Sequence, residues 1–386
     1  MSQPSGGDSR RPETRPLRVA FVATAATSLP FVAPVADALA DRGHQSHIFA
    51  GPDLLGIRPE SRRETFHSVA GLRRKGGAFG LVDPARELAR HFQALHIDAV
   101  VSSTPKAMLA ATAAALWSRV PVRLLWFWGL PAESVTGGRG VALRLLDSAL
   151  VRANHVSWFN SRSLLEVAAE RHPSLRGRFV FNPPGTTHGI PDRYFGPPRE
   201  PAPDRLTIGF VGRLAADKGV DGLVETFLTH LAPRLSAVTL HLVGPVDDRD
   251  PVSAGTRAAI EGSDRIVWDG AVEDTTQVYA DFDLLCFPSF REGFPNAPLE
   301  AAARAVPTVG FDATGTRDAV PRGTGRLVPL GDWDQFWSEV EDLCRDPSSR
   351  LQLGSAAREH AMSLQQHAVV ADHAAFLEAL VTSRLH

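Results

Sequence analysis

Short apolar runs alternate along the chain with segments in which apolar side chains recur at helical spacing. The runs have the length and composition of buried parallel strands. In the first half, the predicted strands are 17–23, 47–50, 99–102, 122–127 and 155–159, and the predicted helices are 29–42, 84–95, 107–117 and 141–153. This alternation predicts an α/β fold with a parallel sheet that carries helices on both faces.

A second series of the same kind follows. Its predicted strands are 206–211, 239–243, 265–268, 284–287 and 308–311, and its predicted helices are 220–230, 298–304 and much of 333–385. The proline-rich segment GPPREPAPD separates the two series and predicts a stiff linker. We therefore expect a disordered tail (1–15), a first Rossmann-like domain (16–195), the linker (196–204), a second Rossmann-like domain (205–365) and a C-terminal helix that packs back on the first domain (366–386).

Composition narrows the class of protein. The length of 386 residues fits two α/β domains, and 44% apolar with 22% charged residues is ordinary for a globular chain. A formal net charge of −2 argues against a broadly basic, nucleic-acid-binding surface. No apolar run approaches the ~20 residues of a membrane span, and the N-terminus lacks a secretory signal. Cys286 and Cys344 predict a reduced, cytoplasmic protein without a disulfide scaffold or a zinc site.

The most specific motif is FPSFREGFPNAPLE, from Phe287 to Glu300. Its Gly and Pro residues predict a strand-to-helix turn, and the N–H groups at the start of the next helix suit a phosphate or sugar oxygen. Glu292 lies in the turn and Glu300 about one helical turn into the helix. Two acceptors placed in this way could bind vicinal hydroxyls.

A second motif, VGRLAADKG, follows the predicted strand 206–211. Gly212 permits close backbone approach, and Arg213 and Lys218 supply two cations that could hold a diphosphate without a metal ion. Lysine occurs only three times, so Lys218 suggests a position that needs a compact ammonium.

Together the two motifs resemble the retaining glycosyltransferases of family 4, and the resemblance covers nearly the whole chain from Leu17. The strings GTRDAV, TGRLVPLGD and STPKA resemble the branch that builds capsular and other surface polysaccharides. The resemblance implies the GT-B fold, in which two Rossmann-like doubly wound domains face each other across a cleft. Parallel sheets of this kind bind ligands at the carboxyl ends of their strands.

Roles for individual residues follow from the resemblance. Arg213 and Lys218 would hold the donor diphosphate, and Glu292 would approach the transferring sugar. Glu300 would bind the ribose hydroxyls. The remaining donor-binding positions would be Gly212, Gly270, Ala271, Val272, Gly293, Phe294, Asn296 and Ala297.

The first domain departs from the family pattern. Its first turn, which includes Thr24 and Ser28 and would complete the phosphate site on the acceptor or sugar side, lacks the usual Gly-Gly pair. Trp128, on the same side, stands where a His near the donor sugar is usual. An indole cannot act as a base, although it can stack on a sugar. Lys106 could reach an anionic acceptor, with a solvated helix-start lysine as the equal alternative.

Two other patterns have simpler structural explanations. Asp281–Asp283 and Asp332–Asp334 resemble Asp-x-Asp metal sites, but Asp283 precedes a buried strand and Asp332 is expected to cap a helix. We expect no metal ion or other cofactor. The basic run Arg73–Lys75 could meet a membrane or a phosphorylated acceptor, but a plain basic loop is favoured.

The sequence therefore predicts a metal-independent, retaining transferase. The donor would be a nucleoside diphosphate hexose, with UDP favoured and GDP as the alternative. The acceptor is unidentified: a glycan, a lipid-linked sugar or a small natural product. A GT-B epimerase and a catalytically inactive nucleotide-sugar-binding protein are the competing hypotheses. The sequence does not address oligomeric state.

Overall fold

The computed structural model describes residues 15–24, 28–52, 65–72, 80–130, 137–198, 205–248 and 250–385. Residues 1–14 of the expected tail, the middle of the turn between Thr24 and Ser28, the basic run Arg73–Lys75 and most of the linker lie outside these ranges. Two compact units make up the chain: Met1–Arg123 with Leu377–His386, and Leu124–Phe376. No helix among the described residues is both long and apolar enough to cross a membrane.

The first sheet has seven strands in the order β3-β2-β1-β4-β5-β6-β7. β1 pairs in parallel with β2 and β4, β2 with β3, β5 with β6, and β6 with β7. The strands are β1 (Arg18–Val22), β2 (Gln45–Ala50), β3 (Thr65–Ser68), β4 (Ala99–Ser102), β5 (Val122–Phe127), β6 (Val156–Phe159) and β7 (Phe179–Phe181).

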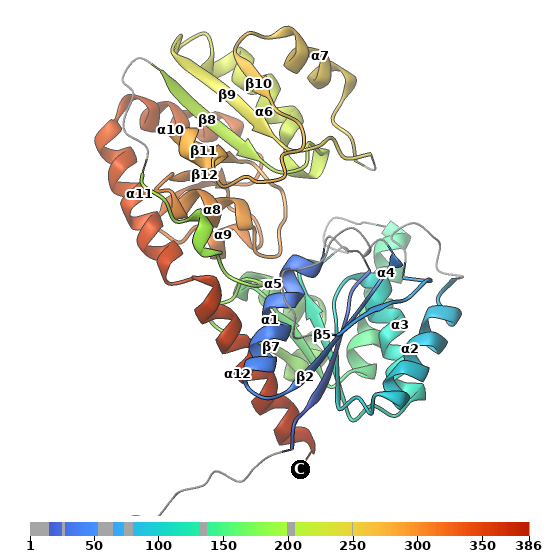
Figure 1. Cartoon of the computed structure of the whole chain (residues 1–386). Coiled ribbons are helices and arrows are strands. Elements are labelled where there is room, and N and C mark those ends of the chain that lie inside the picture. Colours follow the sequence, from blue (N-terminus) through green and yellow to red (C-terminus); the bar gives the residue numbers. More distant parts are fainter. Residues whose placement is uncertain are drawn as a thin grey trace, which may run out of the picture. The chain divides into compact units, whose positions relative to one another are not determined.

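Helices alternate with these strands as the hydrophobic pattern predicts (Figure 1). They are α1 (Leu29–Asp41), α2 (Val82–Ala94), α3 (Pro105–Trp117), α4 (Gly137–Ala153) and α5 (Arg162–Arg171), followed by the short helices η5 (Pro173–Arg178) and η6 (Asp192–Tyr194). Gly43 ends α1 with a φ of +86° and donates its N–H to Ala40, as the sequence predicts for a glycine C-cap. Apolar side chains of α2 and α3 pack together against β1 and β4.

The second sheet has six strands, all parallel, in the order β10-β9-β8-β11-β12-β13. The strands are β8 (Leu206–Val211), β9 (Val238–Val243), β10 (Ile266–Trp268), β11 (Leu284–Phe287), β12 (Thr308–Phe311) and β13 (Gly325–Val328). The helices are η7 (Ala216–Lys218), α6 (Val220–Thr226), the π-helical turn η8 (Phe227–Leu231), α7 (Ala254–Gly262), η9 (Val278–Asp281), α8 (Asn296–Ala303), α9 (Thr316–Ala319), α10 (Trp333–Arg345), α11 (Pro347–Met362) and α12 (Gln366–Leu385).

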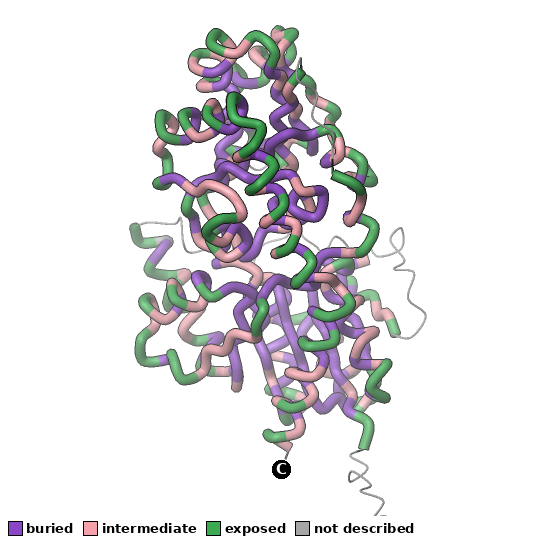
Figure 2. Tube along the Cα trace, turned by 90° about the vertical axis from the view of Figure 1, so that its left-hand side faces the viewer, coloured by how far each residue is buried: buried purple, intermediate pink, exposed green. Residues whose placement is uncertain are grey.

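Strand β11 shows how this sheet forms its core. Leu284 and Cys286 pack with α6, α7 and α10, whereas Leu285 and Phe287 pack with α8, α9 and α11. This two-residue alternation places helices on both faces of the sheet, and the interior strands β8, β11 and β12 are buried along most of their length (Figure 2). Both cysteines are free and buried.

The fold therefore consists of two Rossmann-like parallel sheets. In the second, strand order reverses between β8 and β11, so the loops after these two neighbouring strands meet at one edge. The predicted cleft between two domains, and the domain boundaries, stay predictions.

Candidate functional site

The loops after β8 and β11 bring two of the predicted residues into contact. Lys218 Nζ lies 2.5 Å from Glu292 Oε1, and each of the two side chains is only 16% exposed. Ser289 donates a second hydrogen bond to the same carboxylate oxygen, at 2.8 Å. The structure thus places a compact ammonium and a carboxylate together at the carboxyl edge of the sheet, the position at which parallel sheets bind ligands.

Arg213 has a different carboxylate partner. Its guanidinium forms an ion pair with Asp247, which follows β9 and is only 9% exposed, whereas Arg213 itself is 43% exposed. Both predicted cations are therefore partnered by acidic side chains in this structure. Asp247 was not identified from the sequence, because nothing marks VGPVDD as part of the same site before strand order is known.

Glycines bring the loops after β8, β9 and β10 close together. Gly244 has a φ of +138°, and a Cβ there would overlap the carbonyl oxygen of Gly212. The N–H of Gly244 donates to the carbonyl of Gly270 at 2.7 Å. Gly212 and Gly270 are predicted donor-binding positions. Gly244, which contacts both of them, was not identified from the sequence.

The turn after β11 is packed against the loop after β12. A Cβ on Gly315 would overlap the carbonyl oxygens of Glu292 and Gly293, and a Cβ on Gly293 would overlap the carbonyl oxygen of Trp128. Glu292 also donates its N–H to Thr314, at 3.0 Å. The backbone around Glu292 is therefore fixed by close approaches that only glycine permits.

Helix α8 begins at Asn296, directly after this turn, with Pro295 as its N-cap. Asn296 and Ala297 are half-buried at the start of the helix, and Phe294 is buried in the core. Glu300 lies one turn in and accepts a 2.6 Å hydrogen bond from the Tyr279 hydroxyl at Oε2. Burial raises the pKa of Glu300, and hydrogen bonds from Tyr279 and Tyr194 oppose that rise.

The segment expected to line the base follows β10. Gly270 adopts a φ of +70° with no atom near its missing Cβ, so backbone conformation rather than crowding accounts for this glycine. Ala271 is exposed, and Val272 packs partly against the apolar cluster that contains Tyr279.

The predicted acceptor-side residues lie in the first half of the chain. Thr24 follows β1, and its hydroxyl is bonded to that of Thr104, which has a φ of +73° just before α3. Lys106 is the second residue of α3 and is half-buried. Ser28 precedes α1 without capping it. Trp128 follows β5 with its indole edge-on to Trp126, at 5.5 Å between ring centroids.

The aspartate pairs have structural roles. Asp283 Oδ2 accepts the N–H of Thr207 at 2.8 Å, which ties the amino ends of β8 and β11 together at the edge opposite Lys218. Asp332 caps α10 by accepting the N–H of Gln335 at 3.0 Å, as the sequence predicts. Within the described ranges, no three His, Cys, Asp or Glu side chains are arranged to hold a metal ion.

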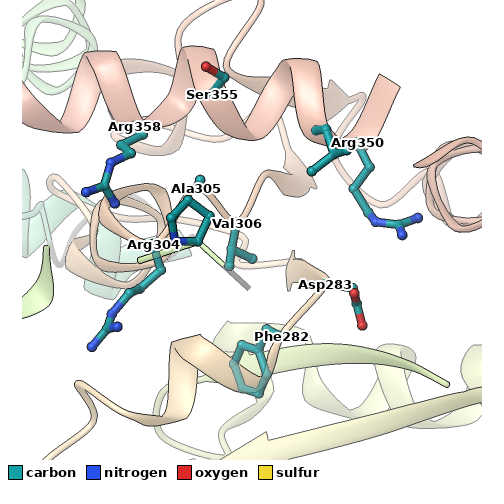
Figure 3. Close-up of a pocket in the computed structure, with 10 residues that line it drawn as sticks. Phe282, Asp283, Arg304, Ala305, Val306, Arg350, Ser355 and Arg358 are labelled. Carbon is teal, nitrogen blue, oxygen red and sulfur yellow. The ribbon is translucent and has the colours of Figure 1, made fainter. Parts of the chain in front are cut away.

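A cavity of about 210 Å³ lies at that opposite edge (Figure 3). Arg350, Ser355 and Arg358 line it from α11, across from Ala305 and Val306 (Figure 3). The arginines bind main-chain carbonyls: Arg350 binds Leu343 and Arg358 binds Gly196, each at 2.7 Å. These bonds tie helix ends and the start of the linker together, and none of the predicted site residues lines the cavity.

Comparison with known proteins identifies a matching family model and several similar enzymes. Residues 205–346 match the family model described as Glycosyl transferases group 1. The capsular polysaccharide biosynthesis glycosyltransferase CapM of Staphylococcus aureus is 28% identical over 270 residues, which is 67% of this chain and 70% of CapM. A GDP-mannose-dependent alpha-mannosyltransferase of Mycobacterium tuberculosis is 34% identical over 128 residues, 33% of this chain and 31% of that protein.

Solved structures show the same fold over nearly the whole chain. Sucrose-phosphate synthase from Thermosynechococcus elongatus superposes with a TM-score of 0.76 at 19% identity, covering 95% of this chain and 99% of that one. Anabaena HepE in complex with UDP-glucose gives 0.74 at 16% identity, covering 94% and 99%. Residues 205–346 thus form a glycosyl transferases group 1 domain, and the chain is a glycosyltransferase with the GT-B fold, similar to the family 4 enzymes of surface-polysaccharide synthesis.

Proposed function

We propose that the protein transfers a hexose-type sugar from a nucleoside diphosphate sugar to a glycan, a lipid-linked sugar or a small natural product, with retention of anomeric configuration. The observation that carries this proposal is the contact of Lys218 with Glu292 at the edge where strand order reverses, inside the group 1 domain. UDP is the favoured nucleotide of the donor, as in the HepE complex, and GDP is the alternative, as in the mannosyltransferase named above.

Charge accounts for how the site would work. Breaking the anomeric bond leaves its electron pair on the diphosphate and builds positive character on the sugar. Lys218 and Arg213 would take the diphosphate as partner in exchange for Glu292 and Asp247, and would stabilise the charge that grows as the bond breaks. Glu292, released from Lys218, would then face the sugar.

The acceptor completes the reaction. Its hydroxyl oxygen would attack the anomeric carbon on the face that the diphosphate leaves, and its proton would pass to a departing phosphate oxygen. No metal ion takes part in this scheme, since side-chain cations balance the charge. Trp128, whose carbonyl meets Gly293, would lie near the sugar and take part in its selection.

The competing hypotheses need features that the proposal does not. An epimerase would need carboxylate and imidazole acid–base groups around the sugar, and an inactive binding protein would need a function without turnover. The relatives named above are transferases, which supports neither alternative. The cytoplasmic location predicted from the cysteines stays a prediction.

Donor identity is the first experiment. A panel of nucleotide sugars is screened by thermal shift, because a ligand that binds only the folded state raises its apparent stability. The stabilising donor, labelled in its sugar, is then incubated with and without candidate acceptors while free nucleoside diphosphate is followed. Acceptor-dependent release, with the product anomer assigned by NMR, would support the proposal. Donor turnover to an isomeric nucleotide sugar would identify an epimerase instead.

A further inference from the structure

Tyrosine is rare in this chain, and its placement is unusual. The sequence contains 20 Phe but only two Tyr, Tyr194 and Tyr279. They come from separate short helices, η6 and η9, yet their rings meet edge-to-face at 6.1 Å between centroids. Both influence the Glu300 carboxylate. The chain thus keeps both of its phenol hydroxyls near one carboxylate, although it has many Phe residues for aromatic packing.

The two hydroxyls have different hydrogen-bond partners. Tyr279, which is fully buried, donates to Glu300 Oε2 at 2.6 Å. The hydroxyl of Tyr194, which is 6% exposed, is 3.0 Å from Thr275 Oγ1. A buried phenol hydroxyl needs a partner, and a carboxylate is the strongest acceptor available to it. Since Phe would fill nearly the same volume, packing alone does not explain why position 279 carries a hydroxyl.

Engagement by Tyr279 leaves the carboxylate with a defined orientation. Oε2 is held by the phenol, and Oε1 is left as the principal acceptor for a ligand. Burial favours the neutral acid and raises the pKa of Glu300, while Tyr279, Tyr194 and the charge of Arg193 favour the ionised form. These three are the groups that act on Glu300 from the neighbouring short helices η6 and η9.

We propose that Tyr279, supported by Tyr194, is a positioning residue that holds one oxygen of the Glu300 carboxylate and leaves the other to accept the ribose hydroxyls of the donor. The inference rests on the proposed function and on the ribose-binding role that the family resemblance implies for Glu300. Tyr279 acts through Glu300 and has no contact with the bond that breaks, so its effect falls on donor binding rather than on the chemical step.

The test is Tyr279→Phe in the full-length protein, assayed with the donor that the nucleotide-sugar panel identifies. The KM for donor should rise about 5- to 10-fold, the scale of one ordinary hydrogen bond, while kcat stays within about twofold. The acid limb of kcat/KM should also move to higher pH, since loss of the hydroxyl lets burial raise the pKa of Glu300 further.

Two companion variants make the result decisive. Tyr194→Phe removes the same atom from the second ring and should change donor KM in the same direction by less, because that hydroxyl is bonded to Thr275. Glu300→Gln tests the carboxylate itself and should raise donor KM more than Tyr279→Phe does. Thermal unfolding of each variant shows whether the fold is retained.

The outcomes separate the two proposals. If Glu300→Gln leaves donor KM unchanged, the ribose role in the proposed function is wrong. If Glu300→Gln raises donor KM while Tyr279→Phe keeps the wild-type KM and acid limb, positioning by Tyr279 is overturned and the proposed function stands. A Tyr279→Phe effect confined to kcat, or to thermal stability, also overturns it, since that pattern indicates a different role.

Discussion

The ends of β8 and β11 and the ends of β1 and β4 occupy equivalent places in the two sheets, yet they are built differently. At β8 and β11, glycines fix the backbone and two cations meet two carboxylates. At β1 and β4, the side-chain contact joins the hydroxyls of Thr24 and Thr104, next to a backbone hydrogen bond from Ser103 to Val22. Backbone contacts restrict which residues fit, whereas hydroxyl contacts are easily replaced. This difference agrees with the specific motifs of the second half and the weaker motifs of the first.

The largest effect is expected at the two cations. Arg213→Ala and Lys218→Ala should each lower kcat by about 10²-fold or more, the scale of one preorganised donor to a developing charge. The loss of kcat in the double variant should be smaller than the product of the two single losses, because both cations stabilise one leaving group. Lys218→Arg should retain little of the wild-type kcat, since a longer, planar guanidinium replaces a compact ammonium. Steady-state kinetics with saturating donor measure all four, and near-wild-type kcat in both alanine variants would remove the proposed role.

Backbone packing at the β8–β10 edge gives the second prediction. Gly244→Ala should destabilise the fold by about 2 kcal/mol or more, because its Cβ would overlap a carbonyl oxygen at a positive φ. Gly262→Ala, at the end of α7 with open space around the added Cβ, is the matched control and should cost less than about 1 kcal/mol. Denaturant unfolding compares them. Equal stability of the two variants would mean that this edge tolerates ordinary residues.

Titration of His67, in β3 of the first sheet, should have a smaller effect on the free energy of unfolding. Burial, followed by the neighbouring His47 and His91, lowers the pKa of His67 to about 4. The unfolded chain therefore binds more protons than the folded one between pH 6.5 and 4, and stability falls as pH falls through that window. His67→Phe should flatten this dependence of stability on pH, because it removes the titrating imidazole. Phe is a suitable replacement, since the His67 ring stacks on Phe49 at 4.5 Å between ring centroids. Urea unfolding across the window measures the slope, and an unaltered slope in His67→Phe would contradict the assignment.

Chelation should have the smallest effect. Because Arg213 and Lys218 supply the positive charge, kcat should change by less than about twofold in EDTA. Loss of turnover that Mg²⁺ or Mn²⁺ restores would show that side-chain cations are insufficient.

The hydrophobic pattern predicted interior strands well and edge strands poorly. The bounds of β4, β5, β8, β11 and β12 agree with the predicted ranges, because strands buried on both faces form continuous apolar runs. The missed strands β3, β7 and β13 are all sheet edges, and their side chains are mostly half-buried or exposed. An edge strand has neighbours on one side only, so its sequence carries less apolar signal. Helices α5 and α7 were also missed.

The residues of the candidate site also fall into two groups, those that the sequence predicted and those that it did not. Motif residues such as Lys218 and Glu292 could be found because each lies in a short, unusual string next to a predicted strand. The partners of the motif residues could not be found in this way. Asp247, which pairs with Arg213, and Tyr194, which acts on Glu300, come from other segments, and only strand order and the path of the chain bring them near. The rarity of tyrosine was a visible clue to Tyr194 and Tyr279, comparable to the rarity of lysine that drew attention to Lys218.

The two lysines among the described residues allow the most direct test of the central claim, that the loops after β8 and β11 bind the donor diphosphate. Isothermal titration calorimetry would measure the Kd of UDP and GDP for the wild type, Lys218→Ala and Lys106→Ala. The account predicts that Lys218→Ala weakens nucleotide binding about 10-fold or more, on the scale of a lost charge-assisted contact, while Lys106→Ala changes it less than about twofold. Equal losses in both variants, or a greater loss in Lys106→Ala, would contradict it.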